Sequence, residues 1–165
     1  MTPVTTADGN PLATLLAQTG ADRVTLRLDV VGMNYPCIAE HVASGVPLMR
    51  TDQSIDQRAA ATAQWVARNR RVLVQPDLEG ADPAPPAALV SVYHVRAQML
   101  APVLDAGVVA GWVSVHSQRG RPWSAAESEA IEHAAASVAA DLDHWYAGTW
   151  QRPVAPPPPP YGPAP

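Results

Sequence analysis

Residues 23–30 carry the most regular pattern of the chain, because apolar side chains alternate there with polar ones. Successive residues of a strand point to opposite faces, so this period of two predicts a strand with one buried face and one face in water. After a turn at residues 32–34, residues 35–43 are predicted to form its hairpin partner. Three further strands are expected at residues 72–74, 97–104 and 108–117. The last is apolar on both faces, which places it at the centre of a sheet.

Helix signals lie between these strands. A first helix is predicted over residues 10–20, because an Asn-Pro pair suits its start and a glycine suits its end. A second is predicted over residues 54–70, where Ser54 and Gln57 have the spacing of a capping box. Residues 87–95 fit either a short helix or a strand. This order of elements is typical of an α+β fold, with an antiparallel sheet and helices on its faces.

The terminal helix is predicted to begin at a capping box of Ser124 and Glu127 and to extend to Tyr146. Apolar residues recur along it at spacings of four and three, the pattern of a helical seam. The seam consists of Ile131, Ala135, Val138, Leu142 and Trp145. It is either core packing or a small contact surface, and in the second case it is the expected site of a homodimer or of a partner protein.

Composition sets the domain count and the class of partner. The chain has 165 residues, which is enough for one domain with its own core. The formal net charge of −4 argues against binding to nucleic acid, which needs a positive surface. No leader and no apolar run of about 18 residues is visible, so no membrane association is expected. A single cysteine, Cys37, excludes a disulfide framework and fits a reducing, cytoplasmic setting.

Proline is concentrated at the end of the chain. Of the 18 prolines, eight fall in the last thirteen residues, and proline lacks the amide proton that helices and sheets need. Residues 151–165 are therefore predicted to be a disordered proline-rich tail. Residues 1–9 are predicted to be a disordered lead-in, which leaves residues 10–150 as the folded domain.

Three stretches resemble the GAF domain family in their order and spacing. They are Arg71-Val-Leu-Val-Gln-Pro-Asp77, then Ala97-Gln-Met-Leu-Ala-Pro-Val-Leu104 with a turn at Gly107, and then Gly111-Trp-Val-Ser-Val-His116 followed by Trp123-Ser-Ala-Ala-Glu127. The resemblance runs from about Pro11 to Leu142. It implies a central five- or six-stranded antiparallel sheet with the N- and C-terminal helices on one face. Loops and short helices of residues 45–95 would cover a ligand pocket on the other face.

The resemblance also implies a function. GAF domains commonly sense small molecules, among them cyclic nucleotides, nitrate, aromatic or oxo acids and tetrapyrroles. The expected function is thus a cytoplasmic small-molecule sensor or regulatory accessory protein that acts through a partner chain or a homodimer. Two alternatives stay open: an enzyme on the same scaffold that uses His41 or His116 as acid and base, and a dimerisation module whose pocket is filled by its own side chains.

The expected ligand is a small anionic or aromatic molecule. The resemblance places Trp112, Ser114 and His116 on the pocket face of the longest strand. In the covering segment, Arg96 is the expected counter-ion for an anion, because its planar fork pairs with two oxygens. The remaining candidates are Tyr93, His94, Met99 and His41. The competing interpretations are core packing for Trp112, a solvated side chain for Arg96 and partly exposed strand-end positions for the histidines.

Several kinds of chemistry lack their residues in this sequence. The histidines have no metal-ligand spacing, so neither a metal nor another cofactor is predicted, and no catalytic residue is assigned. GAF reductases of free methionine-R-sulfoxide use cysteines in the loop before the penultimate strand and acidic residues on the last strand. Here residues 77–96 contain no cysteine, and Ser114 and His116 occupy the acidic positions. Tetrapyrrole attachment also lacks its usual signature, because Cys37 lies on an early strand.

Overall fold

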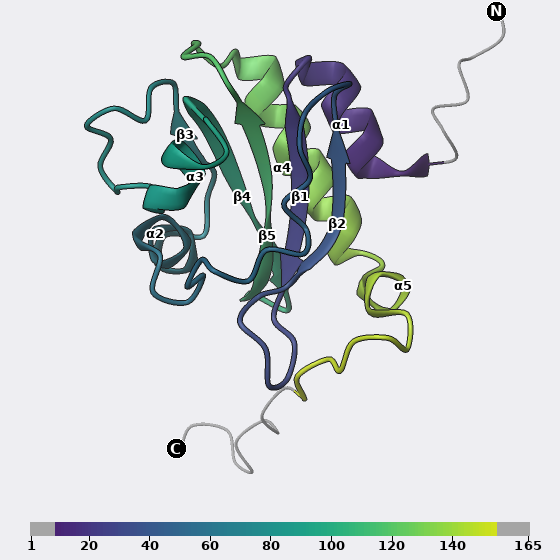
Figure 1. Cartoon of the computed structure of the whole chain (residues 1–165). Helices are drawn as coiled ribbons and strands as arrows, with labels where there is room; N and C mark the ends of the chain where they lie inside the picture. Colours follow the sequence, from purple (N-terminus) through teal and green to yellow (C-terminus); the bar gives the residue numbers. More distant parts are fainter. Residues whose placement is uncertain (1–8, 155–165) are drawn as a thin grey trace, which may run out of the picture.

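A computed structural model describes residues 9–154, and it contains one five-stranded antiparallel sheet (Figure 1). The order of the strands across the sheet is β2-β1-β5-β4-β3. Their bounds are β1 (Arg23–Leu28), β2 (Cys37–Val42), β3 (Leu73–Gln75), β4 (Ala97–Asp105) and β5 (Val108–Ser117). The predicted α+β class and the central position of the longest strand are confirmed.

The terminal helices cover one face of the sheet and enclose the main core. These helices are α1 (Pro11–Thr19), α4 (Ala125–Ala139) and α5 (Leu142–Tyr146). The predicted helix over 124–146 is interrupted, because Asp141 leaves helical geometry at φ −139° and ψ 45°. The four seam residues before Trp145 are 0–4% exposed and belong to the core between helices and sheet. These four seam residues are therefore core packing and offer no free surface to a second chain, whereas Trp145 is partly exposed.

The second helix begins later than its sequence pattern predicts. Helix α2 covers Ala61–Asn69, and residues 54–60 run outside it. Side-chain oxygens accept N–H groups of this segment: Asn34 accepts from Arg58 at 2.9 Å, and the nearby Asp52 and Asp56 accept from Ser54 and Ala59. Gln57 is not a capping residue but is buried at 8% exposure. The predicted start at Ser54 is thus wrong, because one long-range contact and several local turns satisfy this backbone without a helix.

The second face of the sheet is covered by α2, by α3 (Ala87–Ser91) and by the loops around them (Figure 1). The open choice for residues 87–95 is settled as a short helix followed by a turn. All six residues of β1 are buried, including Arg23, Thr25 and Arg27. The prediction that β1 has one face in water is wrong, because the covering segments lie over its polar residues.

Gly111 sets the spacing between β1 and β5. A Cβ at this position would lie 1.9 Å from the carbonyl oxygen of Arg27, far inside van der Waals contact. Only glycine lets the two strands approach so closely. The approach fixes the register in which Arg27 pairs with Trp112 on β5.

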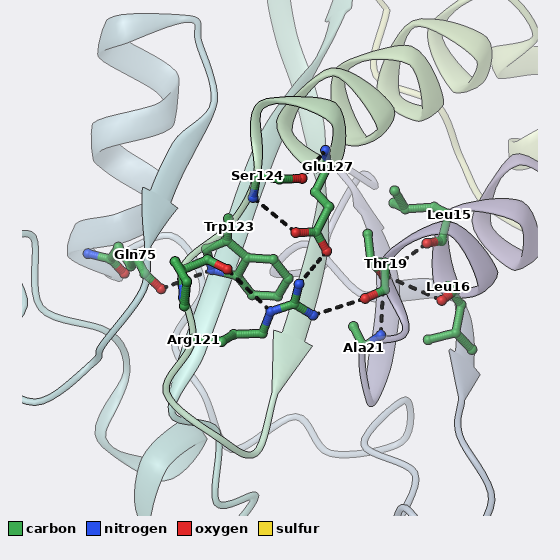
Figure 2. Close-up of polar contacts among 10 residues, drawn as sticks. Leu15, Leu16, Thr19, Ala21, Gln75, Arg121, Trp123, Ser124 and Glu127 are labelled. Carbon is green, nitrogen blue, oxygen red and sulfur yellow. Dashed lines mark hydrogen bonds and ion pairs between the residues drawn. The ribbon is translucent and has the colours of Figure 1, made fainter.

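The loop between β5 and α4 ties the two ends of the domain together (Figure 2). The Arg121 guanidinium donates to the Thr19 carbonyl at the end of α1, at 2.9 Å, and to the Glu127 carboxylate in the first turn of α4. The side chains of Ser124 and Glu127 form the predicted capping box. This loop therefore fixes the relative positions of the two helices that carry the main core.

The folded part of the chain extends past residue 150. The Gln151 carbonyl accepts from the Val31 amide at 3.0 Å, and Arg152 forms ion pairs with Asp105 and Asp143. The predicted tail boundary at 151 is thus too early. The predicted disorder of residues 1–8 and 155–165 lies outside the described residues.

Candidate functional site

A buried polar surface lies between the sheet and its covering segments. In antiparallel strands directly paired residues point to the same face. The register joins Arg23 to His116, Thr25 to Ser114 and Arg27 to Trp112. These side chains are all 6% exposed or less. One face of the sheet is therefore apolar and packed on helices, and the other buries charges and hydroxyls.

Two neighbouring hollows lie over this surface. The first, which we name the inner chamber, has a free volume of about 30 Å³ and is lined by Thr25, Ser114, His116 and Trp112 together with residues of the cover. That volume holds about two water molecules. The second, which we name the vestibule, has about 250 Å³. Three residues line both hollows and form the wall between them: Arg27, Ile55 and Gln57.

Arg23 is the better paired of two buried arginines on this face. Its Nε donates to the Glu40 carboxylate at 3.0 Å, and its Nη2 donates to the Pro47 carbonyl at 2.5 Å. Both side chains of this ion pair are fully buried. The remaining nitrogen, Nη1, is buried and has no hydrogen-bond partner within residues 9–154.

Arg27 has no carboxylate partner. Its Nη1 donates to the Tyr35 carbonyl at 3.0 Å, and no ion pair joins it to any other residue of the described chain. Burial lowers the pKa of Arg27 from its ordinary value, and the nearby Cys37, Glu40 and Asp52 act in the opposite direction. The single buried carboxylate of Glu40 thus faces two guanidinium groups, and the surface carries an excess of one positive charge.

His116 is a neutral hydrogen-bonding group here. Burial, and after it the charges of Arg23 and Arg27, lowers the pKa of His116 to about 3. Its ring is therefore uncharged at neutral pH. Its Nδ1 is buried and, within residues 9–154, has no partner. This nitrogen and Nη1 of Arg23 leave hydrogen-bonding capacity in the buried layer that the described chain does not use.

The structure brings three of the predicted site residues to the inner chamber: Trp112, Ser114 and His116. Tyr93 is buried nearby under the cover, where its ring lies 5.3 Å from the Arg23 guanidinium and its hydroxyl donates to Asp52. Tyr93 lines neither hollow.

The other four predicted residues lie elsewhere. Met99 is fully buried in the core on the helix-covered face, because its neighbours Gln98 and Leu100 take the chamber side of β4. His41 pairs with Val24 on that same helix-covered face, and its Nε2 lies 3.3 Å from the Asn10 side chain. His94 and Arg96 are exposed, because the fully buried Val95 between them turns both side chains outward. The pocket positions predicted for these four are corrected accordingly.

Sequence reasoning missed Arg23 and Arg27 and assigned the counter-ion role to Arg96 instead. A signal was available in the two arginines four residues apart in β1, which must lie on one face of a strand. The alternation in β1 predicts that this face is solvated, and arginines on a solvated face carry no functional signal. Likewise, the capping-box spacing of Ser54 and Gln57 predicts a helix start rather than a buried site for Gln57.

Two further classes of site find no support in the described chain. Within residues 9–154, no group of three or more His, Cys, Asp or Glu side chains could hold a metal ion. None of the helices in this part of the chain is long and apolar enough to cross a membrane.

Comparison with known proteins identifies the family and the fold. The PixJ GAF domain of Thermosynechococcus elongatus superimposes with a TM-score of 0.65 at 21% identity, covering 90% of this chain and 95% of that one. A structure of the cyanobacteriochrome receptor PixJ gives 0.64 at 25% identity, with 80% and 91% covered. The phycocyanobilin-bound GAF domain of a cyanobacterial phytochrome gives 0.66 at 16% identity, with 83% and 82% covered.

A comparison with curated proteins finds no significant match. The family model of the GAF domain matches residues 11–142, which is most of the chain. The protein therefore belongs to the GAF domain family.

Proposed function

We propose that the protein is a cytoplasmic sensor that binds a small molecule in the buried polar surface of its sheet. The observation that carries the proposal is the unused hydrogen-bonding capacity of Nδ1 of His116, a residue that lines the inner chamber. A buried polar atom without a partner costs about 1–3 kcal/mol. A ligand that supplies the partner, directly or through water, recovers this free energy.

The size of the two hollows restricts the ligand. Together they are smaller than the roughly 300–1,000 Å³ of sites for drug-sized molecules. Phycocyanobilin, which one structural neighbour carries, is far too large for an inner chamber of about 30 Å³. The segment 77–96 also contains no cysteine for covalent attachment. These features favour a ligand much smaller than a bilin.

The cover is the element through which binding would be transmitted. Met49 and Leu89 reach the inner chamber from two covering segments, and both are buried there. A ligand that contacts these side chains favours one arrangement of the cover over others. A partner chain or a second copy would read that arrangement. Any such contact must use a surface other than the helical seam, which is buried.

An enzyme that uses a pocket histidine receives less support from the geometry. His41 lies on the opposite face of the sheet. With its pKa lowered to about 3, His116 is a weak base at neutral pH and is not protonated to act as an acid. Binding without turnover is therefore the function that the site supports best.

Native mass spectrometry of the purified chain, followed by thermal denaturation with the released compound, tests the proposal. A ligand at 100 times its Kd should stabilise the fold by roughly 2.7 kcal/mol. Ser114→Leu, which adds bulk beside the inner chamber, should abolish this stabilisation. Ser44→Leu, at an exposed turn, should retain it. The proposal fails if no compound copurifies and no small molecule raises the stability of the wild-type protein by more than it raises that of Ser114→Leu. In that case the dimerisation module with a filled pocket is favoured.

A further inference from the structure

We propose that the site takes a small monocarboxylate, with its carboxylate held by Arg27 at the inner chamber and its less polar body in the vestibule. This inference rests on the proposed function and names the ligand class. It also replaces Arg96, the counter-ion expected from sequence, by a different residue.

The first argument is the position and pairing of Arg27. The residue lines both hollows, so its guanidinium is within reach of a ligand at the boundary between them. The residue is 6% exposed, and its one hydrogen bond, to the Tyr35 carbonyl, leaves the charge without a counter-ion within residues 9–154. Leaving a buried charge unpaired is strongly unfavourable, whereas an anion that meets it with two oxygens forms short, charge-assisted bonds.

The second argument is the charge balance. The surface holds Arg23 and Arg27 against one buried carboxylate, that of Glu40, and His116 is neutral. Arg50 and Asp52 also line the vestibule, and their opposite charges offset each other. One negative charge neutralises this surface. A phosphate dianion would leave an excess negative charge in a buried layer, which carries a large desolvation penalty. The site is therefore matched to a monoanion.

The third argument separates a carboxylate from a simple inorganic anion. The inner chamber has room for about two waters, which is the space that two carboxylate oxygens occupy. Hydroxyls of Thr25 and Ser114 lie in its wall and can donate to those oxygens. The vestibule shares this boundary and presents the apolar side chains of Met33 and Trp150 beside polar residues such as Asn34 and Gln53. An inorganic monoanion would leave those apolar side chains without a partner, whereas the carbon body of a carboxylic acid would cover them.

The test compares matched pairs of acid and amide. The two members of each pair, butyrate with butyramide and benzoate with benzamide, differ in charge but hardly in shape. Nitrate and inorganic phosphate serve as anions without a carbon body. Binding is followed by tryptophan fluorescence, since Trp112 lines the inner chamber and Trp150 the vestibule, and by thermal denaturation. We expect at least one acid to bind roughly 10- to 100-fold more tightly than its amide, in line with a charge-assisted hydrogen bond.

Variants then assign the charge. Arg27→Met should remove the preference for acid over amide, while its melting temperature stays near that of the wild type because an unpaired buried charge is lost. Arg68→Met is the matched control, since Arg68 is an exposed arginine of α2 that lines neither hollow. It should keep the preference. Arg96→Met, at the position expected from sequence, should also keep it.

Three results would overturn the inference. The first is equal affinity for acid and amide in the wild-type protein. The second is nitrate or phosphate binding as tightly as the acids. The third is that no acid binds while native mass spectrometry shows a neutral compound bound to the protein. In the third case the proposed function survives and only the ligand class is wrong, because a compound still occupies the site.

Discussion

Replacing Glu40 by alanine removes the only carboxylate within residues 9–154 that pairs with the buried guanidinium of Arg23. In the native protein that carboxylate also accepts the amides of Met49 and Arg50 at 3.0–3.1 Å, so it holds the covering segment over the inner chamber. Both partners of the ion pair are fully buried. The substitution thus leaves a positive charge with one carbonyl contact and two backbone amides without their acceptor.

The expected loss is large for a single substitution. Removing one partner of a buried ion pair costs about 3–5 kcal/mol, because the remaining charge stays desolvated. For a domain of this size that loss lowers Tm by roughly 6–20 °C. Glu40→Gln should lose less than Glu40→Ala, because its amide oxygen can still accept from Met49 and Arg50. Replacing both partners by methionine should recover much of the loss.

Urea denaturation followed by tryptophan fluorescence measures the free energy of unfolding, and hydrogen exchange reports on the amides of Met49 and Arg50. Asp143→Ala is the control, since that aspartate is 93% exposed in its ion pair and should contribute no more than about 1 kcal/mol. The reasoning is refuted if Glu40→Ala costs no more than Asp143→Ala, or if the two amides exchange as slowly in the variant as in the wild type.

Two further predictions concern pH. As pH falls through 6.5, the ordinary pKa of histidine, His116 binds a proton in the unfolded chain but not in the folded one, where its pKa is about 3. The free energy of unfolding of the wild type should therefore fall by about 2 kcal/mol between pH 7.5 and pH 5. His116→Asn should not show this loss. Hydrogen bonds from Ser54 and then from the Tyr93 hydroxyl lower the pKa of Asp52 from 3.8 to about 2. The ionised carboxylate therefore stabilises the fold above pH 3.8, and this stabilisation is lost as pH falls towards 2. In Tyr93→Phe the pKa of Asp52, measured by carboxyl NMR, should rise.

Each pH prediction has its own control. His144→Asn, at an exposed position of α5, should keep the wild-type dependence of unfolding free energy on pH. If the unfolding free energy of His116→Asn depends on pH as steeply as that of the wild type, the assigned burial of His116 is contradicted. For Asp52, an unchanged titration in Tyr93→Phe would show that the Tyr93 hydroxyl does not stabilise its carboxylate.

Local signals in the sequence determined most of the elements. The Asn-Pro start of α1, its glycine end and the capping box of α4 act within a few residues, and the structure shows all of them. The alternation in β1 and the apolar character of β5 likewise depend on short-range periodicity. The α+β class and the central place of β5 were therefore predictable. Alternation also put Trp112, Ser114 and His116 on one face, and the resemblance to GAF domains indicated that this face lines the pocket.

Only the tertiary structure decided which polar residues are buried. A period of two divides the residues of a strand between two faces, but it does not show what covers each face. Segments far along the chain lie over Arg23 and Arg27 and convert a face expected in water into a charged, desolvated surface. A contact between distant segments, from the Arg58 amide to the Asn34 side chain, likewise lies in residues 54–60, where the sequence predicts a helix. The site thus depends on burial, and burial is a property of the assembled fold, which no local pattern contains.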